Sequence, residues 1–437
     1  MKSKGWMDRS DWGCDMRGRD LLRRGVTRRG FMKGGALALV GTSVIPSFLA
    51  RSVFAEVDRA AASRKRLVVL FQRGACDGLN VVVPYREKNY YAMRPSIAIR
   101  PEQVLDLDGT FGLHPAMAAF QPLFAQGHLA IVHAAGSPDT TRSHFDAQDY
   151  MESGTPGVKA TEDGWLNRAL QAEPVRGQQT AFRAVALGSQ VPRTLAGKLP
   201  AIALSNLADF SVGGKGPQAS PISNAFQAMY DESSDAMLHG TGQETFEAVK
   251  MLKSADPAKY KPAAGVAYPN TPFGNSLKQI AQLMKADLGV EAAFSDIGGW
   301  DTHQNQGDVN GQLANRLKEF SESIAAFWRD LGDDAEHVTL VTMSEFGRTA
   351  RQNGTGGTDH GHANAMFVLG GTVKGGRVYG RWPGLENEHL NEGRDLAVTT
   401  DFRRVLGEAA AKSLNARNLG LVFPGAGVEP SQFLGIL

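Results

Sequence analysis

The chain has 437 residues, of which 42% are hydrophobic, 21% charged and 8% aromatic. Its 50 glycines and 20 prolines follow no short period, which excludes collagen-like proteins and low-complexity disordered proteins. No apolar run reaches the roughly 18 residues that a spanning helix needs, which argues against an integral membrane protein. The formal net charge is +2.

The first elements along the chain indicate export. A twin-arginine pattern, Thr27-Arg-Arg-Gly-Phe-Met-Lys33, precedes an uncharged run at 34–50, and Val53 and Ala55 are the small residues that a signal peptidase accepts. We expect residues 1–55 to be a twin-arginine signal peptide, cleaved near Ala55, and the mature protein to be periplasmic or secreted. The translocase is then a partner during export. A membrane anchor is the alternative, disfavoured because the run is short and contains glycines and a proline.

Removal of this leader changes the charge. Residues 1–55 hold 11 of the 47 basic and 4 of the 45 acidic residues, so the remaining chain has 36 basic and 41 acidic residues, a net charge of −5. No basic stripe remains to neutralise a phosphate backbone, which argues against a nucleic-acid partner. Cys76 is the single cysteine of the mature chain, so an intrachain disulfide is excluded.

The mature chain alternates short apolar runs with helical patterns, as α/β proteins do. A helix is predicted at 271–287, with Thr271 as N-cap and Pro272 at its first position, and another at 310–330, where apolar residues recur every three or four positions. We expect one domain at 56–437, with a possible insertion or cap at about 205–265. The predicted strands are 66–72, 79–83, 128–134, 184–187, 290–295, 337–343 and 365–369.

Residues of metal-binding types follow the predicted strands, and open α/β sheets carry their sites at the carboxyl ends of strands. Asp77 follows the first strand among small residues, although a turn in which it caps its own backbone explains it equally well. Asp301 and His303 follow the strand 290–295 and face one side if the segment is extended. A carboxylate and an imidazole on one side suit a divalent transition metal; the alternative is a helix cap and a surface histidine.

Two further clusters flank the last strands. Glu345 could bind a metal or act as a base, and Arg348 could hold an anionic ester through its planar guanidinium; a structural ion pair between them is the alternative. Asp359, His360 and His362 stand in a glycine-rich loop and offer metal ligands, or a ligand with its orienting carboxylate.

Two hydroxyls are candidate nucleophiles. Thr141 and Ser143 follow the strand 128–134, and either would attack an ester if a metal or a base lowers its pKa. Ser143, with Asp146 three residues later, equally has the pattern of a helix N-cap. The two interpretations are compatible, because a helix N-terminus favours an incoming anion. No dinucleotide fingerprint, Walker motif or G-x-S-x-G elbow is present.

These motifs together carry a family resemblance. The segment 67–84, Trp300-Asp-Thr-His303, Ser344-Glu-Phe-Gly-Arg-Thr349 and Gly357-Thr-Asp-His-Gly-His362 resemble the bacterial family of domain of unknown function 1501 over roughly 64–435. That family is similar to the alkaline phosphatase and sulfatase superfamily. The resemblance implies a three-layer α/β/α sandwich with a mostly parallel central sheet and one or two divalent metals at strand ends.

The resemblance also implies roles. Asp77 is the metal carboxylate after the first strand, Asp301 and His303 belong to one metal site with His360 or His362, and Glu345 stands where the superfamily has a metal-binding Asp. Thr141 or Ser143 is the nucleophile, and Arg142 or Arg348 binds the ester oxygens. Phe346 follows Glu345 where the superfamily has a histidine, so one complete metal site and a weaker second one are expected.

We therefore expect an exported hydrolase of phosphate or sulfate esters that depends on zinc, manganese or calcium. Its substrate is a small anionic ester, including esters carried on a saccharide. One rival interpretation is an inactive relative that binds metal or an anionic ligand. The other is a scaffold or chaperone-like partner for an exported neighbour.

Overall fold

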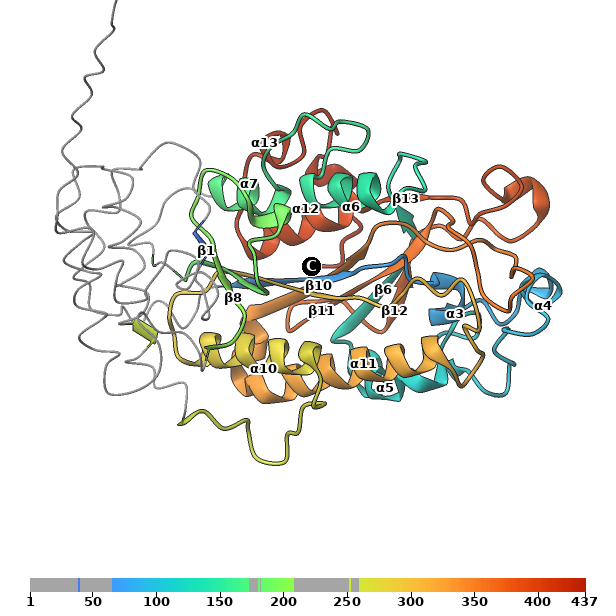
Figure 1. The fold of residues 1–437 in the computed structure, drawn as a ribbon, viewed down its shortest axis with the longest axis horizontal. Helices are drawn as coiled ribbons and strands as arrows, with labels where there is room; N and C mark the ends of the chain where they lie inside the picture. Colours follow the sequence, from blue (N-terminus) through green and yellow to red (C-terminus); the bar gives the residue numbers. More distant parts are fainter. Residues whose placement is uncertain (1–37, 40–64, 173–179, 181, 208–250, 253–258) are drawn as a thin grey trace, which may run out of the picture.

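The computed structural model describes residues 38–39, 65–172, 180, 182–207, 251–252 and 259–437 (Figure 1). Apart from residues 38–39, the predicted signal peptide lies outside these ranges, as does most of the predicted insertion at 205–265. Both remain predictions. None of the described helices combines the length and the apolar character that crossing a membrane requires.

A ten-stranded mixed sheet forms the centre of the described chain. Most neighbouring strands are parallel; β11 runs antiparallel to both of its neighbours, and β1 runs antiparallel to β8. The order across the sheet is β1 (Ala38–Leu39), β8 (Ile202–Leu204), β7 (Ala184–Leu187), β9 (Ala292–Ile297), β2 (Arg66–Gln72), β10 (Val338–Ser344), β11 (Asn364–Gly370), β6 (Leu129–Gly136) and β12 (Arg377–Tyr379), while β13 (Thr400–Asp401) also pairs with β6.

Helices cover both faces of this sheet, which confirms the predicted three-layer α/β/α architecture (Figure 1). On one face lie η3 (Pro115–Phe120), α5 (Gln121–Ala125), α10 (Pro272–Lys285) and α11 (Gln312–Leu331). On the other lie α6 (His144–Ser153), α7 (Trp165–Gln171), α12 (Phe402–Ser413) and α13 (Leu419–Val422).

The central strand β2 shows why both faces are covered. All seven of its residues are buried. Leu67, Val69 and Phe71 belong to the core beneath α7 and α12, while Val68 and Leu70 belong to the core beneath α10 and α11. Successive side chains of a strand point to opposite faces, so a run that is apolar at every position needs a helical layer on each side.

The predicted elements are confirmed except in one place. Thr271 caps α10 as expected, its side chain accepting from the Gly274 N–H. The run 79–83, predicted as a strand, instead forms a helical turn, α3 (Gly78–Val81), followed by β3 (Val82–Val83). A short, fully buried apolar run has no period that separates a strand from a helix, so the pattern could not decide. β3 pairs with β5 (Gly112–Leu113) beside β4 (Leu105–Asp106) in a small second sheet.

Strand direction brings the candidate residues to one edge of the large sheet. The parallel strands β2, β6, β9 and β10 end at this edge. Because β11 is antiparallel to β10 and β6, it begins there. The loop that precedes β11 therefore meets the loops that follow the other four strands.

Candidate metal centre

Three histidines and an aspartate come together at this edge from separate segments. His144 is the first residue of α6, and Ser143 caps that helix by accepting from the Asp146 N–H at 3.4 Å. Asp301 and His303 lie in the loop after β9, and His360 lies in the loop before β11.

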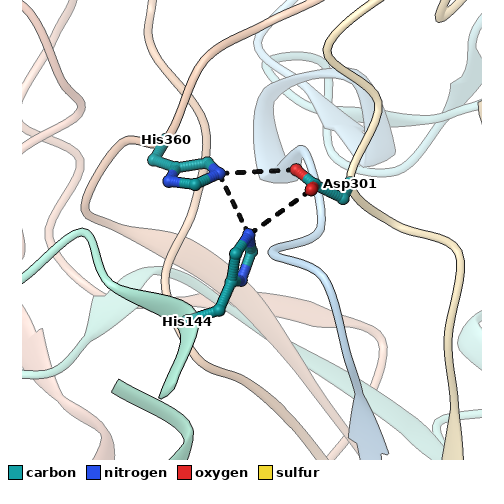
Figure 2. A group of neighbouring side chains, drawn as sticks. All are labelled: His144, Asp301 and His360. Atoms are coloured by element: carbon teal, nitrogen blue, oxygen red, sulfur yellow. Dashed lines mark hydrogen bonds and ion pairs between the residues drawn. The ribbon is translucent and has the colours of Figure 1, made fainter. Parts of the chain in front are cut away.

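His144, Asp301 and His360 point toward one another, and their ligand atoms all lie within 4.8 Å of each other (Figure 2). The Nε2 atoms of His144 and His360 are 3.0 Å apart. The Asp301 carboxylate lies 3.6 Å from Nε2 of His144 and 3.4 Å from Nε2 of His360. All three side chains are partly exposed, so that a ligand in solution can reach the group.

His303 adds a third imidazole. Its Nε2 lies 2.9 Å from Nε2 of His360 and 3.1 Å from Oδ1 of Asp301. His360 therefore stands between the other two histidines, and each of the three directs the same ring nitrogen toward the Asp301 carboxylate.

The second nitrogen of every imidazole is held by an acceptor. Nδ1 of His144 lies 2.9 Å from Oε1 of Glu345, and Nδ1 of His303 lies 3.1 Å from Oδ1 of Asp359. Nδ1 of His360 lies 2.8 Å from the backbone oxygen of Arg142. A carboxylate or a carbonyl can only accept, so these contacts assign the proton of each neutral ring to Nδ1 and leave a lone pair on Nε2.

This arrangement fits a metal ion. Lone pairs facing one another across about 3 Å repel unless a proton or a cation lies between them. In a tetrahedral zinc site with Zn–N distances near 2.0–2.1 Å, two ligand atoms stand about 3.3 Å apart. The separations around Asp301 and His360, from 2.9 to 3.6 Å, are close to that value. Metal-bound histidines characteristically donate their other ring N–H to a carboxylate or a carbonyl.

Glu345 is placed to orient His144. Its side chain is buried, and Oε1 also accepts from Nε2 of Gln148 at 2.9 Å and from the Gly74 N–H at 2.8 Å. Burial alone would raise its pKa, but these donors and His144 together lower the pKa of the Glu345 carboxyl. In turn, the hydrogen bond to Glu345 raises the pKa of His144, whereas burial lowers the pKa of His360.

Arg348 is placed to orient Asp301. Its buried guanidinium is hydrogen-bonded to Oδ1 of Asp301 and donates to backbone oxygens of three loops, including that of Ala75 at 2.7 Å. Burial opposes ionisation of Asp301, yet the contact with Arg348 and the nearby histidines lower the pKa of this carboxyl. The hydrogen-bond donors of Arg348 are thus engaged by acceptors of the protein itself.

Two glycines allow the loops to approach this closely. A Cβ on Gly74, which has a φ of +115°, would lie 2.8 Å from the backbone nitrogen of Asp301. A Cβ on Gly361 would lie 2.3 Å from the backbone carbon of Arg348. Any larger residue would push apart the segments that carry the candidate ligands.

Asp77 lies beneath these loops, in a different arrangement. It is fully buried, and its two carboxylate oxygens accept from Arg94 at 2.6 and 2.9 Å. Oδ2 also accepts from Nε2 of Gln306 at 2.7 Å. Asp77 is therefore engaged by an internal cation, and its predicted role as a metal ligand stays a prediction.

The remaining predicted residues lie around the group. Ser143 is exposed, and the oxygen of Thr141 accepts from the Ser143 N–H at 3.3 Å. Nε2 of the buried His362 lies 2.9 Å from the backbone oxygen of Ser137. Arg142, whose backbone oxygen holds His360, pairs through its side chain with Asp395 at 2.6 Å.

His144 is the residue that the sequence analysis missed. It stands in the segment considered for a nucleophile, directly after the helix cap Ser143. Its only signal is that this segment follows the strand β6, whose carboxyl end meets the edge where the other candidates converge.

Solved structures of low similarity match much of the chain. The lipoteichoic acid synthase LtaP from Listeria monocytogenes is 6% identical with a TM-score of 0.32, covering 71% of this chain and 66% of its own. The periplasmic domain of EptC from Escherichia coli, solved with zinc, is 10% identical with a TM-score of 0.33, covering 71% and 74%. A mutant of the alkaline phosphatase PafA is 11% identical with a TM-score of 0.30, covering 65% and 64%. The chain thus spans slightly less than two thirds of the first and the third.

Sequence comparison gives a family but no characterised relative. No curated protein matches the sequence. The model of a family described as "Protein of unknown function (DUF1501)" matches residues 64–418, which is most of the chain and includes all four residues of the candidate centre. The protein therefore belongs to the DUF1501 family.

Proposed function

We propose that the protein is an exported, metal-dependent hydrolase of phosphate or sulfate esters. The observation that carries the proposal is that three imidazole Nε2 atoms lie within 3.1–3.6 Å of the Asp301 carboxylate, while every Nδ1 is held by an acceptor. Side chains that only packed against each other would not need three lone pairs directed to one place.

His144, Asp301 and His360 would hold the metal, and His303, whose Nε2 lies beside Asp301 and His360, is the further candidate ligand. Imidazoles with a single carboxylate suit zinc or manganese, whereas calcium prefers a shell of oxygen ligands. A metal bound there would lower the pKa of a coordinated water or hydroxyl toward about 7 and offset negative charge on the ester.

The chain's own residues would prepare the site. Glu345 holds His144 with its free nitrogen outward, and Arg348 holds the Asp301 carboxylate. Ser143 is exposed and directly precedes His144 in the sequence, at the start of a ten-residue helix. We therefore prefer Ser143 over Thr141 as the attacking hydroxyl, since a helix N-terminus stabilises an approaching anion.

Elemental analysis tests the metal. We expect the wild type, purified without chelator, to contain about one zinc or manganese per chain and the Asp301→Ala/His303→Ala variant to contain none. His389→Ala is the matched control, because that histidine is exposed and pairs with Glu386. A wild type that is metal-free and cannot be reloaded contradicts the proposal.

Turnover tests the reaction class. The metal-loaded protein should hydrolyse p-nitrophenyl phosphate or p-nitrocatechol sulfate, and Ser143→Ala should lose this activity while retaining its metal. Thr141→Ala should stay active. If Thr141→Ala alone abolishes turnover, the nucleophile is assigned to the wrong hydroxyl, and if no ester is turned over by any metal form, the hydrolase assignment fails.

A second candidate function is a metal-binding exported protein without turnover. The two arginines expected to bind the ester oxygens favour this candidate, because both are engaged within the protein. Arg348 pairs with Asp301, and Arg142 pairs with Asp395. This candidate predicts metal at full stoichiometry, no ester hydrolysis, and equal affinity for inorganic phosphate or sulfate in the wild type and in Ser143→Ala.

Export by the twin-arginine route is part of the proposal. Arg28→Lys/Arg29→Lys should leave the full-length precursor in the cytoplasm, whereas the wild type should yield a mature chain that begins near Glu56. N-terminal sequencing of the fractionated protein checks both outcomes, and unchanged export of the double variant contradicts this route.

A further inference from the structure

Gln306 is a buried amide with a polar partner on each side. Its side chain has no exposed surface, and Oε1 accepts from Oγ1 of Thr302 at 2.7 Å and from Oγ1 of Thr358 at 2.9 Å. On the other side, Nε2 donates to Oδ2 of Asp77 at 2.7 Å. Both threonines are buried as well.

The two threonines belong to the loops that carry the candidate ligands. Thr302 stands between Asp301 and His303, and Thr358 lies two residues before His360. The Thr358 N–H also donates to the backbone oxygen of Thr302 at 3.1 Å. Gln306 thus fastens the loop after β9 to the loop before β11 at the position where both reach the centre.

The Asp77–Arg94 pair fixes which way the amide points. The Asp77 carboxylate can only accept, so it takes the NH₂ group of Gln306 and directs the amide oxygen to the two hydroxyls. Arg94 is itself held, because it donates to the backbone oxygens of Thr349 and Ala350 at 2.8 and 2.9 Å. The amide therefore has one orientation, anchored in the fully buried layer beneath the ligand loops.

We infer that Gln306 is a positioning residue that sets the spacing between Asp301 and His303 on one loop and His360 on the other. The inference rests on the proposed metal centre. Loss of the amide leaves two buried hydroxyls without their acceptor, and loss of either hydroxyl removes one of the two hydrogen bonds that Oε1 of Gln306 accepts. Either change weakens the connection between the loops, so that they can shift apart. A shift of this kind changes the geometry of the ligands without removing one. Residues that hold metal ligands in place affect the affinity for the metal in this way.

Cobalt(II) tests the inference without relying on activity, because its visible absorption reports coordination geometry and its titration gives an affinity. The variants Thr358→Val and Thr302→Val remove one hydroxyl at nearly constant volume, while Thr358→Ser and Thr302→Ser retain it. We expect the valine variants to bind cobalt about tenfold more weakly, with an altered spectrum. The serine variants should bind it as the wild type does. Gln306→Leu should show the larger loss if it folds.

Thr339→Val is the matched control. Thr339 is buried and hydrogen-bonded to Ser413 at 2.8 Å, but it lies near the start of β10, away from the edge that carries the centre. This variant should lose stability and keep its cobalt affinity and spectrum. If the valine and serine variants bind cobalt equally well, the positioning role of Gln306 is overturned, but the metal centre is not. The same follows if Thr339→Val weakens cobalt binding as much as the other valine variants do. A wild type that binds no cobalt overturns both this inference and the metal centre.

Discussion

At the scale of single residues, the centre depends on the groups that hold each imidazole by its second nitrogen. Glu345 is the most constrained of them, since it is buried and serves His144, Gln148 and the Gly74 N–H through one oxygen. His144 cannot turn without leaving a buried carboxylate short of a donor. The orientation of the imidazole is therefore set by the protein before any ligand arrives.

This leads to a graded prediction for Glu345. Glu345→Ala removes both the acceptor and its charge, so metal affinity should fall by about 10–100-fold. Glu345→Gln keeps an acceptor and loses only the charge, so its loss should be smaller. Competition with a metal-binding dye measures both, with the exposed Glu388→Gln as control. If Glu345→Gln loses more metal affinity than Glu345→Ala, an acceptor at this position does not help to hold His144, and the prediction is wrong.

Residue patterns could locate part of the centre and no more. Asp301, His303 and His360 stand in glycine-rich loops beside strands, where ligands of a sheet edge are expected, and the structure brings them together. His144 carries no such pattern, because a histidine after a helix cap is ordinary. Asp77 has the right type and position, but its partner Arg94 is 17 residues away and no spacing rule links the two.

At the scale of elements, the start of α10 was predictable because its chemistry is local. Thr271 accepts from the Gly274 N–H at 3.1 Å, and Pro272 occupies the first helical position. Thr271→Ala should lower the free energy of unfolding by about 1 kcal/mol, because one helix N–H loses its acceptor. Thr271→Ser should stay close to the wild type. Urea midpoints compare the three proteins, and equal midpoints for alanine and serine would contradict the cap.

The end of α11 gives a prediction that depends on pH. Asp330 is buried and accepts from the hydroxyls of Tyr260 and Tyr268 at 2.6 and 2.8 Å and from Nζ of Lys285 at 3.0 Å. Burial works toward a higher pKa, but these donors and the Ala263 N–H lower the pKa of Asp330. The ionised form is thus favoured in the folded state, and the stability that it contributes is present above the unfolded pKa of about 3.9 and lost as the pH falls through the folded value.

Asp330→Asn should therefore cost about 2 kcal/mol at pH 7, since hydrogen bonds from two tyrosines and a lysine to a charged acceptor are lost or weakened. The difference from the wild type should shrink as the pH falls below about 4. Urea unfolding at stepped pH values measures this gap, and the exposed Asp333→Asn should show little effect at any pH. A gap that stays constant down to pH 3 would mean that folding does not lower the pKa of this carboxyl.

At the scale of the whole molecule, the alternation of apolar runs and helical patterns was enough to predict an α/β protein, and the family resemblance implied the three layers. Neither predicted the direction of every strand. The sequence of β11 is as apolar as those of its neighbours β10 and β6, and all seven of its residues are buried. Its antiparallel direction follows from the path of the chain after β10, which returns at the same edge through the loop that holds His360. The site depends on that return, since a parallel β11 would place His360 at the opposite edge.

Because the centre joins segments from residue 144 to residue 360, a metal bound there should stabilise the whole fold. A ligand that binds only the folded chain adds about 2.7 kcal/mol when its free concentration is 100 times Kd. Zinc or manganese should raise the Tm of the wild type and a chelator should lower it, whereas His144→Ala/His360→Ala should respond to neither. Calorimetry at fixed ionic strength measures these shifts, with His389→Ala expected to respond as the wild type does. The two proteins differ only in these two histidines. If the metal raises the Tm of the double variant as much as that of the wild type, the metal therefore binds elsewhere.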